Sequence, residues 1–249
     1  MDHQAYVEMD EAEGEHWWFT ARREIVGHMI RRLGLPAHAS ILEIGSGTGG
    51  NLRMLSSFGE VSAMEMNTTA IAMAVRKNGD RFDIRAGSCP GNIPFDTERF
   101  DLICLFDVLE HIEEDVATLV AIRQLLADGG KIFLTVPAYP WMWSGHDAFV
   151  HHKRRYSLQE LQDKVVAAGF HVCRLSFFNT LLFPLVAGAR LVGKLFGRDV
   201  VSGTAVPSAP VNRLLNMVFR FERHLLGRYD LPFGVSLLAV LEIKGEREG

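Results

Sequence analysis

Apolar runs alternate with amphipathic stretches along much of this chain. Runs of apolar residues bounded by polar or glycine-rich turns predict buried strands, whereas helical spacing of apolar residues predicts the segments between them. The strands are expected at 40–45, 60–65, 81–86, 100–106 and 131–136. The helices between them are expected at 49–58, 68–77 and 114–127, with another at 16–33 before the first strand. This alternation predicts an α/β fold around a mostly parallel sheet.

The second half of the chain follows a different pattern. A helix is expected from Ser157, where Glu160 completes a capping box, and residues 170–178 and 235–243 alternate like strands. The stretch between these two strands contains two further helical patterns, at 180–196 and 210–227.

Glycines follow the first apolar run and form a turn that suits a ligand. Residues 41–50 read ILEIGSGTGG, in which Gly45, Gly47 and Gly50 have the G-x-G-x-x-G spacing. Such glycines let the backbone approach a ligand closely, and the helix that follows offers unpaired N–H groups. Glu65 lies 20 residues after Gly45, where an acidic side chain can hold ribose hydroxyls. The turn alone fits NAD as well as S-adenosylmethionine (SAM).

Glu43 favours SAM over NAD. It interrupts the first apolar strand two residues before Gly45. A carboxylate is costly to bury unless it is paired, so we expect Glu43 to face a cationic group or to fix the loop. A nearby carboxylate would repel a pyrophosphate but not the ammonium group of a methionyl moiety.

Four blocks, taken together, resemble the class I SAM-dependent methyltransferases. They are ILEIGSGTGG at 41–50, Glu65 after VSAM, FDLICLFDVLEHI at 100–112 and LLADGGKIFLTVP at 125–137. The HD…HHKRRY pattern after position 145 is similar to methyltransferases of type 11 or 12. The resemblance implies a Rossmann-like seven-stranded sheet, mostly parallel with an antiparallel last strand and with helices on both faces. It also implies SAM as cofactor. An NAD-dependent oxidoreductase and a catalytically silent SAM-fold binding or scaffold protein remain as alternatives.

The resemblance also implies a domain organisation. A single domain spans 1–249, with an N-terminal lid helix in 1–36 and a core at 37–178. The family joins its last two strands by a short connection, so 179–233 is interpreted as a helical cap insertion before the last strand at 234–249.

Cofactor-binding roles follow from the resemblance, position by position. Glu43 and the backbone of Gly45 and Gly47 should hold the methionyl part, Glu65 the ribose and Met66 the adenine. The family often has Gly-Asp-Ala after its third strand, and here Ser88 replaces the aspartate. The remaining candidates are Phe106 and Asp107 after the fourth strand, and Trp18 and Arg22 on the lid helix, where Arg23 is an alternative to Arg22.

The loop at 137–157 is the expected acceptor site. His146, Asp147 and His152 are candidate catalytic residues, because a histidine that titrates near neutral pH can take the proton of an attacking hydroxyl. Alignment alone can also accelerate methyl transfer, so a dedicated base is optional. Arg154 and Arg155 are candidates for binding a substrate phosphate or carboxylate, and His111 for fixing its loop or contacting substrate. No metal is expected, because neither His146/Asp147 nor His151/His152 has helical i, i+4 spacing and a third ligand.

Composition limits the possible cellular location and the possible binding partners. The chain has 249 residues and a formal net charge of −4, which argues against nucleic-acid binding. Three scattered cysteines, the lack of an apolar N-terminal segment and the lack of a spanning segment predict a cytoplasmic protein.

Residues 179–233 add a membrane surface as a second possible location. The expected helices there are apolar on one face and basic on the other. They are interpreted as a cap over the acceptor pocket, a peripheral membrane contact or a homodimer surface. An apolar cap suits a small or amphiphilic acceptor, such as a lipid-linked sugar or a secondary metabolite. Oxygen is the favoured atom for methylation.

Overall fold

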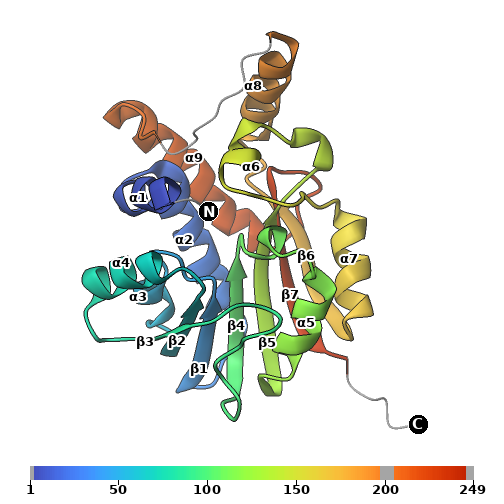
Figure 1. Ribbon diagram of the computed structural model, residues 1–249. Helices are drawn as coiled ribbons and strands as arrows, with labels where there is room; N and C mark the ends of the chain where they lie inside the picture. Colours follow the sequence, from blue (N-terminus) through green and yellow to red (C-terminus); the bar gives the residue numbers. More distant parts are fainter. Residues whose placement is uncertain (1–2, 197–204, 245–249) are drawn as a thin grey trace.

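A seven-stranded sheet forms the centre of the computed structural model, which describes residues 3–196 and 205–244 (Figure 1). The strands are β1 (Ala39–Ile44), β2 (Gly59–Glu65), β3 (Asp83–Ala86), β4 (Phe100–Phe106), β5 (Leu126–Pro137), β6 (Phe170–Phe178) and β7 (Ser236–Ile243). Their order is β3-β2-β1-β4-β5-β7-β6, with β1 to β5 parallel and β7 antiparallel to both β5 and β6. The predicted fold class is therefore confirmed.

Helices cover both faces of this sheet. They are α1 (His3–Ala12), α2 (Trp17–Ile30), α3 (Leu52–Leu55), α4 (Thr68–Asn78), α5 (Asp115–Arg123), α6 (Gly145–Phe149), α7 (Leu158–Ala167), α8 (Phe183–Phe196) and α9 (Ala209–Leu226). Two short 3₁₀ turns, η1 (Leu109–His111) and η2 (Pro140–Met142), follow β4 and β5. In Figure 1, α1 and α2 lie on the same side as α9, and α8 stands above the sheet beside α6.

Two predicted helices are shorter in the structure, and one helix was not predicted. The helix expected at 49–58 shrinks to α3, because Gly49 has φ +79° and the turn continues to Asn51. The helix expected at 114–127 ends at Arg123, and Leu126 already pairs with Phe100 in the sheet. The sequence analysis placed no helix at α1, a largely polar segment with a weak apolar stripe.

The core consists of two apolar layers, one on each face of the sheet. Strand residues two apart share a face, so Leu42 and Ile44 belong to one layer and Ile41 to the other. Glu43 lies on the same face as Ile41, the face that α2 covers. Each fully buried leucine or phenylalanine stabilises the fold by about 1.5–3 kcal/mol. This packing holds the carboxyl ends of the strands in fixed positions.

Helix α9 packs along α2 and becomes part of the layer that covers the sheet. The side chain of Asn212 accepts a hydrogen bond from the backbone N of Trp17 at 2.8 Å. Phe219 is fully buried, edge-on to Trp17 and stacked on Phe178. The segment predicted to be an insertion therefore has two parts, because α9 packs on α2 whereas α8 reaches toward the loop after β5.

Candidate active site

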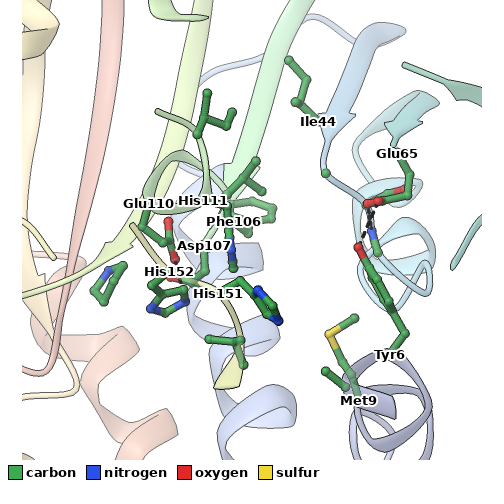
Figure 2. A pocket seen from close by; sticks show the side chains of 18 of the residues that line it. Tyr6, Met9, Ile44, Glu65, Phe106, Asp107, Glu110, His111, His151 and His152 are labelled. Atoms are coloured by element: carbon green, nitrogen blue, oxygen red, sulfur yellow. Dashed lines mark hydrogen bonds and ion pairs between the residues drawn. The ribbon is translucent and has the colours of Figure 1, made fainter. Parts of the chain in front are cut away.

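A cavity of about 640 Å³ opens at the carboxyl ends of β1, β2 and β4 (Figure 2). Its other walls come from α1, α2, the loop after β5 and Arg190 of α8. Crevices at the carboxyl ends of parallel strands are the usual ligand sites of open α/β sheets. Eleven of the thirteen predicted site residues line the cavity: Trp18, Arg22, Gly45, Gly47, Glu65, Met66, Ser88, Phe106, Asp107, His146 and His152. Glu43 and Asp147 lie behind its wall.

The backbone of the glycine turn lies so close to neighbouring side chains that only glycine fits at positions 45 and 47. Gly45 and Gly47 have φ +69° and +54°, which favour glycine. A Cβ on Gly45 would lie 2.6 Å from a methyl of Val108, and one on Gly47 would lie 2.9 Å from the terminal methyl of Met9. The N–H groups of Gly45 and Ser46 both donate to the carbonyl of Met64, so the turn is fixed against β2.

Glu65 is buried at the end of β2 and accepts three hydrogen bonds. Its donors are the backbone N of Gly47 at 2.9 Å, the backbone N of Asn67 at 2.9 Å and the hydroxyl of Tyr6 at 3.2 Å. Figure 2 shows Tyr6 reaching from α1 to this carboxylate. Burial, followed by the charge of Glu65, raises the pKa of the Tyr6 hydroxyl, so it stays protonated and donates. Tyr6 carried no signal in the sequence, because no helix was expected there.

Glu43 contacts the cavity only indirectly. Its Oε1 accepts a hydrogen bond from the Asn51 side chain at 2.7 Å, and Asn51 lines the cavity. Its buried Oε2 has no hydrogen-bond partner in the described part of the chain. Burial raises the pKa of Glu43 to about 8, although the hydrogen bond from Asn51 acts in the opposite direction. Of the two expected roles, the geometry favours fixing the loop.

Arg22, rather than Arg23, reaches the strand ends. Its guanidinium lies 3.0 Å from a carboxylate oxygen of Asp107 and 4.8 Å from the ring centroid of Trp18. Arg23 instead donates to the carbonyl of Glu13. Arg22 is buried, and its Nη2 has no hydrogen-bond partner within the described ranges. It keeps a donor for an anionic ligand group.

The two adenine candidates differ in how they are held. Met66 lies on the cavity rim with 73% of its surface exposed, which leaves its side chain free to pack on a flat ring. Ser88 is fixed by paired backbone hydrogen bonds with Asn92 at 2.8 and 2.9 Å.

Asp147 is fully buried and acts as the centre of a polar network. It accepts hydrogen bonds from Arg155 Nε at 2.7 Å, Ser144 N at 2.8 Å, His152 Nδ1 at 2.9 Å, Ser144 Oγ at 3.1 Å and Arg190 Nη1 at 3.2 Å. Burial alone would raise the pKa of Asp147, but the hydrogen bond from His152 and the charges of Arg155 and Arg190 hold it well below its usual range. A carboxylate so fully engaged positions its neighbours instead of taking a substrate proton.

Four histidines predicted or discussed from the sequence, His111, His146, His151 and His152, lie in the cavity wall. His146 is half-buried, and burial lowers its pKa to about 4. The ring of His152 lies 4.7 Å from that of His111 and 6.4 Å from that of His146, between centroids. Glu110 of η1 lies beneath them and was missed by sequence reasoning, although it belongs to the quoted block at 100–112.

The two arginines proposed to bind substrate serve the protein itself. Arg154 pairs with Asp115 at 2.8 Å and with Glu113 at 3.3 Å. Arg155 is buried between Asp147 and the carbonyl of Ala138. Arg190 of α8 is the cation that reaches the cavity from the insertion.

These features fit the methionyl and ribose parts of SAM. The glycine turn leaves room beside its backbone, and Glu65 offers a buried acceptor. Ser46 Oγ is also buried without a hydrogen-bond partner among the described residues. The fold and site therefore define a nucleotide-binding α/β protein of the methyltransferase class.

Comparison with known proteins agrees. Residues 17–180 match the model of a methyltransferase domain family, and the chain belongs to that family. SAM is the cofactor of this class.

The curated relatives are distant. The chain is 24% identical over 161 residues to a probable SAM-dependent methyltransferase of Mycolicibacterium smegmatis, covering 64% of this chain and 61% of that protein. It is 25% identical over 145 residues to a ubiquinone biosynthesis O-methyltransferase of Xanthomonas axonopodis, covering 53% and 61%. The chain thus spans about three fifths of these curated relatives.

A solved structure supports the fold over nearly the whole chain. A methyltransferase of Haloferax volcanii, solved with the Trm112 methyltransferase activator, superposes with a TM-score of 0.65 at 18% identity. It covers 99% of this chain and 97% of its own.

Proposed function

We propose that this protein transfers the methyl group of SAM to a hydroxyl oxygen of a small amphiphilic molecule. One observation carries the proposal: a single cavity joins the glycine turn and Glu65 to a wall of histidines and apolar side chains. Phe149, Val150 and Ile112 belong to that wall, which suits an acceptor with an apolar part. The match to an O-methyltransferase adds support for oxygen.

When bound, SAM supplies a methyl group made electrophilic by its sulfonium. The chain's own residues bind and align the two reactants. Glu65 accepts the ribose hydroxyls once Tyr6 has released one of its oxygens, and Arg22 offers Nη2 to the methionyl carboxylate. Methyl transfer is an in-line displacement, so holding the acceptor oxygen opposite the departing sulfur supplies much of the acceleration.

The acceptor hydroxyl is proposed to lie against His152. Asp147 accepts a hydrogen bond from His152 Nδ1 at 2.9 Å, so Nε2 is the nitrogen left for the substrate side. As the acceptor oxygen bonded to the methyl carbon and the carbon–sulfur bond broke, Nε2 of His152 would take the hydroxyl proton. Asp147 takes a positioning role here, in place of the catalytic role expected from the sequence.

The first experiment is calorimetric titration of the purified protein with SAM, with NAD as a parallel control. The proposal expects stoichiometric SAM binding and no heat with NAD. Methyl transfer is then measured with labelled SAM and hydroxylated acceptors that differ only in alkyl-chain length. NAD binding would favour the oxidoreductase alternative. SAM binding without transfer to any hydroxyl would favour a silent SAM-binding protein.

A membrane surface is the proposed source of the acceptor. Val211, Leu214, Met217 and Phe221 lie at helical spacing on α9, and each is 46–56% exposed. Arg213 and Arg220 lie beside them and are exposed too, so this face could rest on anionic lipid. Arg198, another basic residue in the segment 179–233, lies outside the described residues. No helix in 3–196 or 205–244 is long and apolar enough to cross a bilayer.

Vesicle sedimentation tests the membrane proposal. Binding to phosphatidylserine vesicles but not to neutral ones is expected, and the double variant Leu214→Ser/Phe221→Ser should lose it. Val166→Ser is the matched control, since Val166 is 51% exposed on α7. If the double variant instead abolishes a dimer seen by light scattering, this face is a homodimer surface.

A further inference from the structure

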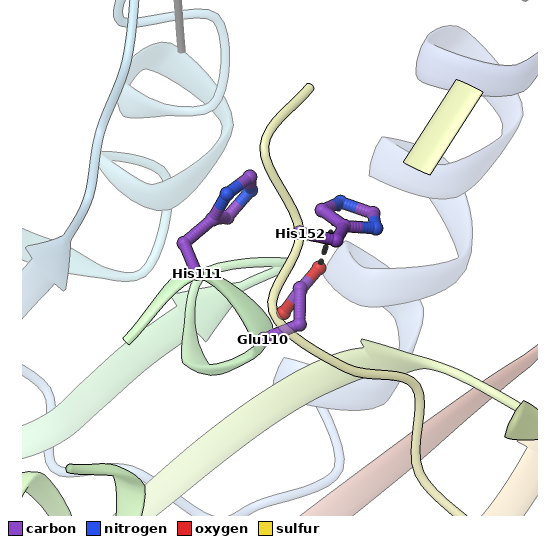
Figure 3. Close-up of side chains that lie close together, drawn as sticks. All are labelled: Glu110, His111 and His152. Carbon is purple, nitrogen blue, oxygen red and sulfur yellow. Dashed lines mark ion pairs between the residues drawn. The ribbon is translucent and has the colours of Figure 1, made fainter. Parts of the chain in front are cut away.

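Three potential metal ligands converge on one wall of the cavity. They are a carboxylate oxygen of Glu110 and ring nitrogens of His111 and His152, which all lie within 4.8 Å of one another (Figure 3). Glu110 and His111 come from η1, whereas His152 comes from the loop after α6. Because 41 positions separate His111 from His152, the sequence does not present the three as a motif.

Glu110 is the unusual member of this cluster. It is fully buried, and neither of its oxygens has a hydrogen-bond partner in the part of the chain that the structure describes. The nearest cationic candidate is His152 Nε2, 3.7 Å from Oε1. A buried carboxyl without a hydrogen-bond partner destabilises the fold, unless a cation at this position offsets the cost.

The two histidines are prepared to act as ligands. Asp147 accepts the Nδ1 hydrogen of His152, which leaves the Nε2 lone pair directed at Glu110. A carboxylate behind a ligating histidine is the usual outer partner in metal sites. His111 offers a ring nitrogen from the same 3₁₀ turn that carries Glu110.

The nearby arginines are already paired with carboxylates other than Glu110, so they do not take the place of a cation. Arg22 is paired with Asp107 at 3.0 Å, and Arg155 is paired with Asp147 at 2.7 Å. All three candidate ligands line the cavity, so an ion can enter from it. In a tetrahedral zinc site the ligand atoms lie about 3.4 Å apart, so side-chain shifts of about 1 Å would close this one.

We propose that Glu110, His111 and His152 bind one divalent transition-metal ion, with a further coordination position open to the cavity. Two imidazoles and one carboxylate suit Zn²⁺, Fe²⁺ or Mn²⁺ better than Ca²⁺ or Mg²⁺. No metal was expected from the sequence, because the pairs His146/Asp147 and His151/His152 lack a third ligand and Glu110 and His111 are not adjacent to them in the chain.

This site would give the acceptor hydroxyl a second route to activation, and that part rests on the proposed function. A hydroxyl oxygen that binds the ion loses its proton to water more readily. The resulting oxyanion attacks the methyl carbon, the carbon–sulfur bond breaks, and its electron pair stays on sulfur. His152 is then a ligand, and the proton leaves through solvent.

The test uses untagged protein stripped with EDTA and titrated calorimetrically with Zn²⁺ and Mn²⁺. One ion per chain is expected, and Co²⁺ should give the visible absorption of a low-coordinate nitrogen and oxygen site. Glu110→Gln and His111→Ala should each weaken metal binding at least tenfold. Tenfold is the smallest loss of metal affinity usually seen when a residue that only supports a ligand is replaced. Glu60→Gln and His171→Ala are the controls, because both residues are exposed and lie on the same sheet.

Thermal unfolding separates binding from folding. Glu110→Gln replaces a buried carboxyl that lacks a hydrogen-bond partner with an amide of the same shape. The metal-free variant should therefore melt no lower than the metal-free parent protein, whereas added Zn²⁺ should raise the midpoint only of the parent protein. Binding that is equal in the parent and both ligand variants, or no binding of any ion, overturns the metal site. SAM titration of the same samples distinguishes this failure from failure of the proposed function.

Discussion

The two sides of the cavity are built in different ways. On the donor side, the glycine turn and Glu65 follow directly from consecutive parallel strands, so their positions are set by the sheet. On the acceptor side, His111, His152 and Arg190 come from η1, a loop and α8, and are held together by side-chain contacts. A site formed by the backbone of consecutive elements can be recognised in the sequence as a motif. A site formed by side chains from distant segments cannot, because the fold decides which residues meet.

Glu43 gives the largest expected effect, on the donor side. Its pKa is raised to about 8, so its stabilising contribution is fully present below the unfolded value of 4.5 and is lost as pH rises through 8. Glu43→Gln removes this loss and should leave stability unchanged at pH 4. At pH 9 it should raise the free energy of unfolding, by at most about 5 kcal/mol for such a shift.

Urea unfolding at both pH values measures the Glu43 effect. Glu60→Gln, an exposed glutamate on β2, serves as the control. A variant that is equally stable to the parent protein at pH 9 would mean that Glu43 is already ionised and paired in the folded protein.

Asp147 gives the next effect, on the acceptor side. Asp147→Ala would leave the buried guanidinium of Arg155 without its carboxylate partner. Breaking a buried ion pair in this way costs about 3–5 kcal/mol. Chemical unfolding should show that loss, with Asp163→Ala on the exposed face of α7 as the control. If the free energy of unfolding falls by less than about 1 kcal/mol, the range of surface ion pairs, the Asp147 network does not hold the acceptor side of the cavity together.

The sequence predicted the elements of the fold better than their ends. The strand at 170–178 and the helices of the insertion were placed almost as observed, because their apolar periodicity is clear. The helix expected at 114–127 was too long, because the pairing of Leu126 with Phe100 is a tertiary contact that overrides local preference. α1 was missed, since its burial depends on a cavity wall formed by distant segments.

The same division holds in the site. Gly45, Gly47 and Glu65 were found from spacing alone, and the structure brings them to one cavity. The hydrogen-bond network of Asp147 could not be predicted from spacing, because it depends on Arg155 and Arg190 being folded against this carboxylate. Glu110 was overlooked because a buried, unpartnered carboxyl is visible only once its surroundings are known.

Glu65 tests the donor side most directly. Glu65→Ala removes the acceptor of the ribose hydroxyls, and hydrogen bonds to a charged group are worth about 1.5–3 kcal/mol each. SAM affinity should fall about 100-fold by calorimetry. Glu65→Gln keeps one acceptor and should lose less, which separates ribose binding from collapse of the Gly47 turn. Unchanged affinity in both variants would remove Glu65 from the cofactor site.

Tyr6 gives the smallest effect, because it links the donor side to a helix outside the sheet. Its hydroxyl donates to Glu65 at 3.2 Å, on an oxygen that the ribose also needs. α1 must therefore yield this bond when SAM binds, and a hydrogen bond to the charged Glu65 carboxylate costs about 1.5 kcal/mol to give up, the lower end for a charged acceptor. Tyr6→Phe should then bind SAM about tenfold more tightly, because this bond no longer has to be broken. Tyr6→Phe keeps the ring that packs against the cavity, so calorimetry reports the hydroxyl alone. Weaker binding would instead mean that Tyr6 contacts the cofactor, and that α1 closes over SAM without competing for Glu65.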